Sequence, residues 1–247
     1  MATPDLTVIR YEDIDSQVRR YSHHAFLHAA HIRPHASRFH FDAARSILQA
    51  ADLSIDVARR ILEAVLLLHR GLAIHEDVDG VQELRRQLNV LAGDYCSSRY
   101  YWIIARTGNE TLVQALSDSV VRINESKMTL HRRAHDLTGD EYLAIQDTIH
   151  GDLLYTLATV FRRDDADTLA VIKSGVQAYI VRRDVEDPIG PRHFTLRQAL
   201  DHLTDTREFV ARSRASVRFA PVASFVSDSW HLLQRRLDQQ SYVEGNR

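Results

Sequence analysis

The chain has 247 residues, of which 45% are hydrophobic and 26% charged, which excludes bulk disorder and suffices for a core without disulfides. It holds only 9 Gly and 5 Pro, too few for the many turns of a β-sandwich or barrel, so the composition predicts an all-α fold. Lys plus Arg number 31 against 33 acidic residues, and this net charge of −2 argues against a nucleic-acid-binding protein.

Hydrophobic residues at helical spacing, together with capping residues and breakers, predict a series of helices. We expect residues 1–15 and 241–247 to be frayed. The predicted helices span residues 14–31, 41–51, 55–79, 81–105, 111–137, 141–161, 167–185, 195–212 and 222–240. The strongest break, residues 187–191, is too short for a linker between domains. The sequence therefore predicts one helical domain over residues 1–247, a bundle of about eight to ten helices.

Three features indicate the compartment. The single cysteine, Cys96, excludes a disulfide framework and a cysteine-based zinc module. The longest apolar stretch, Ile61–Ile74, is interrupted by charged residues and is too short to cross a membrane. Residues 1–10 contain no apolar run of signal-peptide length. We expect a cytoplasmic protein with no membrane span and no nucleic-acid partner.

An acidic cluster follows the apolar helix 55–79, in the order His75-Glu76-Asp77-Val78-Asp79-Gly80. Glu76 and Asp79 are three residues apart and share a helix face, where two carboxylates can hold a hard cation such as Mg²⁺. The alternative is a solvated helix end, and the helix dipole disfavours anions at this position.

A Gly-Asp pair, Gly93-Asp94, interrupts the next predicted helix within Leu91–Tyr95. Glycine inside a helix costs roughly 1 kcal/mol relative to alanine, so the position needs a reason. Close approach of a second helix is one such reason, and Asp94 would then face a cavity or a partner.

The order of these motifs resembles that of the trans-isoprenyl diphosphate synthases. The resemblance implies an isoprenoid-synthase-type helical bundle in which two aspartate-rich motifs face each other across a cavity and hold an allylic prenyl diphosphate through Mg²⁺. The residues that align with the first motif are Glu76, Asp77 and Asp79, and those that align with the second are Arg183, Asp184 and Asp187.

Both aligned motifs depart from the family pattern. Gly80 stands where the last carboxylate of the first motif belongs, and Arg183 places a permanent cation at a ligand position of the second. Ile149 stands where the family has a lysine that binds diphosphate. A cluster of Mg²⁺ ions needs anionic oxygens from both motifs. We therefore expect no catalytic residue and no metal site in this chain alone, with Mg²⁺ bound mainly by a partner.

Three sequence blocks, residues 87–95, 100–101 and 123–128, resemble the small subunits (component I) of bacterial heptaprenyl diphosphate synthases. This implies a non-catalytic regulatory subunit that works with a large catalytic subunit (component II), elongating farnesyl diphosphate with isopentenyl diphosphate for the menaquinone side chain. The motif and interface residues are then Gly93, Asp94, Tyr95, Tyr100, Tyr101, Asn124, Glu125 and Lys127. The alternative for residues 94–104 is an ordinary core helix, and for Glu125 an ordinary surface carboxylate.

Gly71 and Leu72 precede the acidic cluster by five and four residues. In short-chain synthases, as the resemblance implies, bulky aromatic residues there form the floor of the elongation tunnel. We predict that Gly71 leaves this floor open.

Other functions stay as alternatives. His24, His28, His31 and His35 are spaced to share a helix face and could bind zinc. A His-Asp phosphohydrolase would need a dyad on a helix, and the only His-Asp pair, at 135–136, lies beside a predicted loop. A free-standing terpene synthase or prenyl-diphosphate-binding protein, or a scaffold without a prenyltransferase partner, completes the set.

Overall fold

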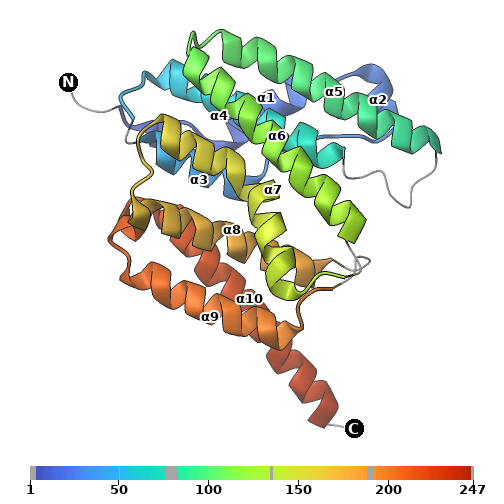
Figure 1. The fold of residues 1–247 in the computed structure, drawn as a ribbon, viewed down its shortest axis with the longest axis vertical. Helices are drawn as coiled ribbons and strands as arrows, with labels where there is room; N and C mark the ends of the chain where they lie inside the picture. Colours follow the sequence, from blue (N-terminus) through green and yellow to red (C-terminus); the bar gives the residue numbers. More distant parts are fainter. Residues whose placement is uncertain (1–3, 50, 76–82, 134–135, 188–191, 246–247) are drawn as a thin grey trace. The chain divides into compact units, whose positions relative to one another are not determined.

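The computed structural model describes residues 4–49, 51–75, 83–133, 136–187 and 192–245, with side chains up to residue 240. These residues form helices joined by short connections, and no strand occurs among them (Figure 1). The predicted all-α class is confirmed.

The helices follow the chain in simple order. The α-helices are α1 (Tyr11–Tyr21), α2 (Ala25–Ala29), α3 (Arg38–Gln49), α4 (Ile55–Ile74), α5 (Glu83–Ala105), α6 (Glu110–Arg133), α7 (Gly139–Val160), α8 (Ala166–Glu186), α9 (Leu196–Arg212) and α10 (Ala220–Gly245). Two 3₁₀ turns, η1 (Leu6–Val8) and η2 (Arg214–Val217), precede α1 and α10.

The chain divides into two compact units, residues 1–115 and 116–247. The division falls inside α6, where helical sequence continues without a Gly or Pro, so no local signal marks it. One domain over residues 1–247 therefore stays a prediction.

Unit 1 is built around α4. Every residue from Ile61 to His69 is buried, because α1, α3 and α5 all pack against this helix. Ser54 caps the start of α4: its hydroxyl accepts a hydrogen bond from the Val57 N–H, and Asp56 lies in the first turn.

Unit 2 is built around α8, which packs against α7, α9 and α10. A capping box begins α7, in which the Thr138 hydroxyl and the Glu141 carboxylate each accept a hydrogen bond from the other residue's N–H. Thr195 and Gln198 begin α9 in the same way.

The helix predicted over residues 14–31 is wrong. The Ser22 hydroxyl donates to the Val18 carbonyl at 2.7 Å and α1 ends, after which α2 is a separate short helix. His31 has a φ of 58°, in the left-handed region, which no helix continues through.

The prediction of a frayed N-terminus is wrong for residues 4–15. Leu6, Ile9 and Ile14 are fully buried, and the Leu6 N–H donates to Gln49 Oε1 at 2.8 Å. These three apolar residues lie in a polar context, and their burial against α3 and α4 is a tertiary effect. At the other end, the backbone of α10 continues to Gly245, five residues beyond the predicted end at 240.

Candidate functional site

The structure describes the residues before and after the first acidic motif. Glu76, Asp77 and Asp79, together with Gly80, lie outside the described residues. The last described residue before them is His75, which ends α4.

The second motif lies in the last turn of α8 and just beyond it. Arg183 is exposed, and its Nη1 donates to Tyr179 Oη at 3.3 Å while its guanidinium lies 5.5 Å from the centroid of the same ring. Glu186 pairs with Arg182 at 3.2 Å and with Arg236 at 3.9 Å. Arg183 thus places a cation at one ligand position of the aligned motif. The Glu186 carboxylate is shared between Arg182 and Arg236.

Asp184 is buried, with 6% of its surface exposed. Its carboxylate accepts hydrogen bonds from the main-chain N–H of His193 at 3.1 Å and of Phe194 at 3.0 Å, and lies 3.0 Å from His193 Nδ1. The Tyr142 ring stacks on the His193 ring at 3.6 Å, and burial together with the Asp184 charge raises the pKa of Tyr142 to about 12. Asp184 therefore anchors the start of α9.

The described residues of the second motif do not fit an Mg²⁺ site. A hard cation such as Mg²⁺ needs carboxylate oxygens that point toward it. Asp184 Oδ1 and Oδ2 both accept hydrogen bonds from the protein, so neither is directed to a cation. Asp187 is the other aligned carboxylate among the described residues of this motif, and a single carboxylate does not assemble a metal cluster.

His75 at the end of α4 meets Gly93 and Asp94 of α5 where these two helices pack together. His75 lies over Gly93, where an added Cβ would approach the imidazole Nε2 to 2.3 Å. His75 Nε2 is also 3.6 Å from Asp94 Oδ1. Gly93 thus makes room for a histidine, and Asp94 faces that histidine at the surface.

Gly71 lies one turn earlier on α4 and explains the close approach of these helices. A Cβ at position 71 would be 2.9 Å from the Cys96 Cβ and 3.3 Å from the Gly93 carbonyl oxygen. The neighbouring Leu72 is buried. The space beside Gly71 is therefore filled by α5, and the tunnel role of Gly71 and Leu72 stays a prediction.

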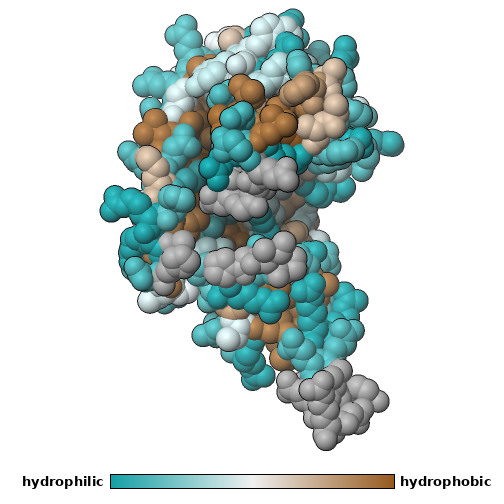
Figure 2. All heavy atoms as spheres, turned by 90° about the vertical axis from the view of Figure 1, so that its right-hand side faces the viewer, coloured by the Kyte–Doolittle hydropathy of each residue, from teal (hydrophilic) through white to brown (hydrophobic). Residues whose placement is uncertain are grey.

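The outer face of α5 is exposed over its full length. A stripe with alternating spacings of three and four residues is exposed, in the order Leu84, Gln87, Leu91, Asp94, Ser98, Tyr101 and Ala105. Tyr100 is fully buried, whereas Tyr95 contacts the His24 ring and accepts a hydrogen bond from Arg99. Hydrophobic atoms, brown in Figure 2, also reach the surface between hydrophilic side chains on the face drawn there.

The third block of the resemblance lies on the second half of α6. Asn124 and Glu125 are exposed and Lys127 is half-buried. From residue 124 to 133 no side chain of α6 is buried, although Ile123 just before them is fully buried. This half of α6 leaves an accessible surface that includes Met128, 60% exposed.

Ile149, which stands where the family has a lysine that binds diphosphate, is buried on α7 and carries no side-chain donor. Near the start of α5, Arg85 donates from Nη1 to the Ala30 carbonyl at the end of α2.

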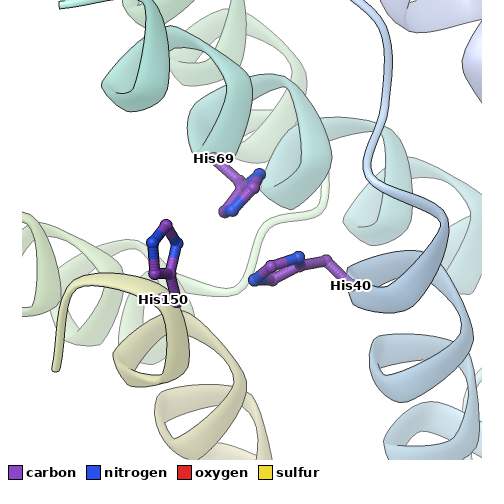
Figure 3. Close-up of side chains that lie close together, drawn as sticks. All are labelled: His40, His69 and His150. Carbon is purple, nitrogen blue, oxygen red and sulfur yellow. The ribbon is translucent and has the colours of Figure 1, made fainter. Parts of the chain in front are cut away.

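The histidines that meet are not the predicted ones. His24, His28, His31 and His35 form no group with metal-ligand spacing among the described residues, because α2 is too short to carry them on one face. The close-up in Figure 3 instead shows His40 of α3 and His69 of α4, whose ring centroids are 3.7 Å apart.

These two rings lie in unit 1, where His40 Nδ1 is 2.7 Å from the Ser37 hydroxyl. His150, also labelled in Figure 3, belongs to unit 2, where its ring contacts Tyr179. Within the described part of unit 1, no third ligand residue lies close enough to His40 and His69 to complete a zinc site. Twenty-nine residues separate the pair, so no sequence spacing could have indicated the contact.

Comparison with solved structures identifies the fold. A decaprenyl diphosphate synthase from Rhodobacter capsulatus superposes with a TM-score of 0.62 and 12% identity, covering 91% of this chain and 97% of that chain. A polyprenyl synthase from Caulobacter crescentus, complexed with calcium and isoprenyl diphosphate, superposes with a TM-score of 0.62 and 14% identity. The match covers 91% of this chain and 96% of that chain. A geranylgeranyl pyrophosphate synthase from Lactobacillus brevis superposes with a TM-score of 0.53 and 18% identity. The match covers 93% of this chain and 87% of that chain. The fold is that of the isoprenyl diphosphate synthases, as predicted.

Sequence comparison identifies the family. The family described as heptaprenyl diphosphate synthase (HEPPP synthase) subunit 1 matches residues 24–173. Component 1 of the heptaprenyl diphosphate synthase of Geobacillus stearothermophilus is 34% identical over 114 residues, 45% of this chain and 51% of that protein. The chain thus spans about half the length of this curated relative. The chain belongs to the heptaprenyl diphosphate synthase subunit 1 family.

None of the helices in the described part of the chain is both long and apolar enough to cross a membrane.

Proposed function

We propose that this chain is the non-catalytic, regulatory subunit of a heteromeric trans-polyprenyl diphosphate synthase. The observation that carries the proposal is the state of Asp184, whose carboxylate is buried and accepts hydrogen bonds that fix the start of α9. Membership of the subunit 1 family supports a partner, and the similarity to a heptaprenyl diphosphate synthase component supports heptaprenyl diphosphate as the product.

In the proposed assembly, the large catalytic subunit (component II) binds the allylic prenyl diphosphate. Mg²⁺, held mainly by that subunit, supplies the charge that lets the allylic diphosphate ionise before it joins isopentenyl diphosphate. The present chain supplies no ligand from its second motif. Its own contribution is a packed helical surface that holds the partner in its active conformation and walls the growing chain. We place this reaction in the cytoplasm, in the synthesis of the menaquinone side chain.

We assign the partner contact to the exposed stripe of α5, residues 84–105, and to the exposed half of α6, residues 124–133. Spacings of three and four residues are those with which a helix packs against another helix. Leu91 is 59% exposed and Tyr101 is 48% exposed, although both are large apolar side chains that favour burial. Asp94 and Asn124, which belong to the family blocks, lie on these surfaces.

The test measures incorporation of radiolabelled isopentenyl diphosphate with farnesyl diphosphate and Mg²⁺. We expect no product from this chain alone and long prenyl diphosphates when the large subunit is added. Tyr101→Asp should abolish partner-dependent product and co-elution with the partner. Phe209→Asp, at an aromatic on α9 that is 41% exposed, serves as the matched control and should leave both unchanged.

The alternatives give different outcomes in this experiment. Turnover by the chain alone would contradict the non-catalytic proposal and assign a working metal site to Glu76 and Asp79. No product from the chain alone and none from the mixture would favour a scaffold or a free-standing prenyl-diphosphate-binding protein.

The tunnel proposal has its own variant. Gly71→Phe is not a clean test, because any side chain there meets Cys96 and the Gly93 carbonyl. Leu72→Phe adds an aromatic ring at the neighbouring position. Unchanged product length in the assembled enzyme would contradict a role for this part of α4 in chain length.

A further inference from the structure

Unit 1 contains a cleft that the proposed function does not use. Its volume is about 330 Å³, and it lies where the start of α4 meets the end of α5. At about 1.5 Å per helical residue, Arg60 is roughly 22 Å along α4 from His75, which precedes the first acidic motif. The cleft is therefore separate from the positions at which the resemblance places the reaction.

Three guanidinium groups line this cleft. Arg59 and Arg60 come from α4, and Arg106 follows the end of α5. Among the described residues, none of these three arginines is within ion-pair distance of a carboxylate. Three guanidinium groups that form no close ion pair within one concave surface favour an anionic occupant, and guanidinium is the side chain best suited to bind phosphate oxygens.

Aromatic side chains form the other wall. Trp102 is 50% exposed, its ring is 6.4 Å from the Tyr21 ring, and the Arg106 guanidinium lies 4.7 Å from its centroid. The Arg106 guanidinium is thereby held by stacking over an aromatic face, with its N–H donors left for a ligand. The indole offers an apolar surface for whatever group the anion carries.

Two carboxylates modulate the charge. Asp56 lies at the rim, and Glu63 is 6% exposed, at 3.4 Å from the Tyr21 hydroxyl that donates to it. Three arginines against two acids leave the cleft with a positive balance of one charge, and with two when Glu63 is protonated. Burial raises the pKa of Glu63, which favours the protonated form.

We propose that this cleft binds a phosphate or diphosphate ester, with the anionic group on Arg59, Arg60 and Arg106 and the organic group against Trp102. A volume of about 330 Å³ is at the lower end for small-molecule sites and suits a compact ligand. The same chemistry is found in a soluble phosphate ester and in the headgroup of an anionic lipid.

The first experiment titrates inorganic diphosphate into the full chain without its partner, by calorimetry in the absence of metal. We expect saturable binding with one site per chain. Arg106→Gln should weaken binding about tenfold or more, since one charge-assisted contact is lost. Arg106→Lys should restore part of the affinity. The double variant Arg59→Gln/Arg106→Gln should show none.

Two further variants separate this site from general charge effects. Arg212→Gln, an exposed arginine on α9, removes the same charge elsewhere and should leave the affinity unchanged. Glu63→Gln removes a negative charge beside the ligand and should tighten binding several-fold. Far-ultraviolet circular dichroism on each variant checks that it is folded.

A second experiment distinguishes the sources of the ligand. Sedimentation with vesicles of phosphatidylglycerol, compared with phosphatidylcholine, measures lipid binding. Arginine-dependent retention on phosphatidylglycerol assigns a lipid headgroup, and diphosphate binding without retention assigns a soluble ester.

The proposal fails if neither diphosphate nor vesicles bind, or if the arginine variants bind like the wild type. Because both experiments use the chain alone, failure here leaves the regulatory-subunit proposal untouched. Failure of the partner experiment equally leaves this proposal untouched.

Discussion

The crossing of α4 and α5 and the junction of α8 with α9 both pair a histidine with an aspartate, and they use the pair differently. At the α4–α5 crossing, His75 and Asp94 are 3.6 Å apart, with 31% and 67% of their side chains exposed. At the α8–α9 junction, His193 and Asp184 are 3.0 Å apart, with 11% and 2% exposed. Water screens the first pair, whereas the second must satisfy its charge from protein donors alone.

This difference separates residues that hold the fold from residues that remain available to a partner. Asp184 holds the fold, whereas Asp94 remains available to a partner, although both lie in sequence blocks that resemble the synthases. A motif residue therefore acquires its role from its burial, and the following variants test that distinction.

The largest effect is expected from Asp184→Ala. It leaves the N–H groups of His193 and Phe194 without their acceptor in a buried place, so the free energy of unfolding should fall by about 3 kcal/mol. Asp118→Ala, at an exposed carboxylate on α6, should change it by less than about 0.5 kcal/mol. Urea denaturation without Mg²⁺ measures both. Full stability of Asp184→Ala would contradict the anchoring role.

The next effect concerns the two glycines of the α4–α5 crossing. Gly71→Ala places a Cβ against the Cys96 Cβ and a carbonyl oxygen, which do not yield easily, and should cost about 1–3 kcal/mol. Gly93→Ala meets only the flexible end of His75, and a helix-propensity gain of about 1 kcal/mol offsets the displacement. Equal effects of the two variants in thermal or urea unfolding would contradict this account.

Two glutamates should shift the acid dependence of stability in opposite directions. Hydrogen bonds from the Thr138 N–H and from Arg133 lower the pKa of Glu141 to about 2 from its ordinary 4.5. Its contribution is therefore complete above about pH 4.5 and is lost as the pH falls toward 2. Burial raises the pKa of Glu63, so its ionised form opposes folding at neutral pH, and that opposition disappears as the pH falls.

At pH 7, Glu141→Gln should therefore lower the melting temperature by a few degrees and Glu63→Gln should raise it slightly. Both differences should shrink in acid. Glu110→Gln, in the first turn of α6, is the matched exposed control. Melting curves between pH 2 and 7 that show the same sign for both variants would refute the assignment.

The smallest effect on stability is expected from Asp94→Asn. The exposed pair with His75 should contribute no more than about 0.5 kcal/mol, and less in high salt. Association with the large subunit should weaken if Asp94 lies in the interface. A loss of several kcal/mol in the chain alone would place Asp94 with Asp184 instead.

Several parts of the fold were predictable because their causes are local. Ser54 and Thr138 each cap the helix that follows them, and the apolar run 61–74 fills the centre of unit 1. The predicted break falls between the end of α8 at Glu186 and the start of α9 at Leu196. The helix over 14–31 failed because Ser22 and His24 end and restart the helix through their own hydrogen bonds, which hydrophobic spacing does not record.

The candidate site divides in the same way. Arg183 places a permanent cation at an aligned position of the second motif, which is a property of its residue type. That Asp184 binds the backbone at 193–194, and that His75 covers Gly93, depends on distances between helices. The arginine cleft joins α1, α4 and α5 and has no signature in any one segment.

The sequence by itself therefore determined the helical class, most helix boundaries, the family and the loss of acidic motif residues, because these follow from residue type and local spacing. Only the tertiary structure decided which polar groups are buried, which glycines separate helices and where cations gather. Those properties arise from packing between distant segments, where burial changes the free energy of a charge by more than its neighbours in the sequence do.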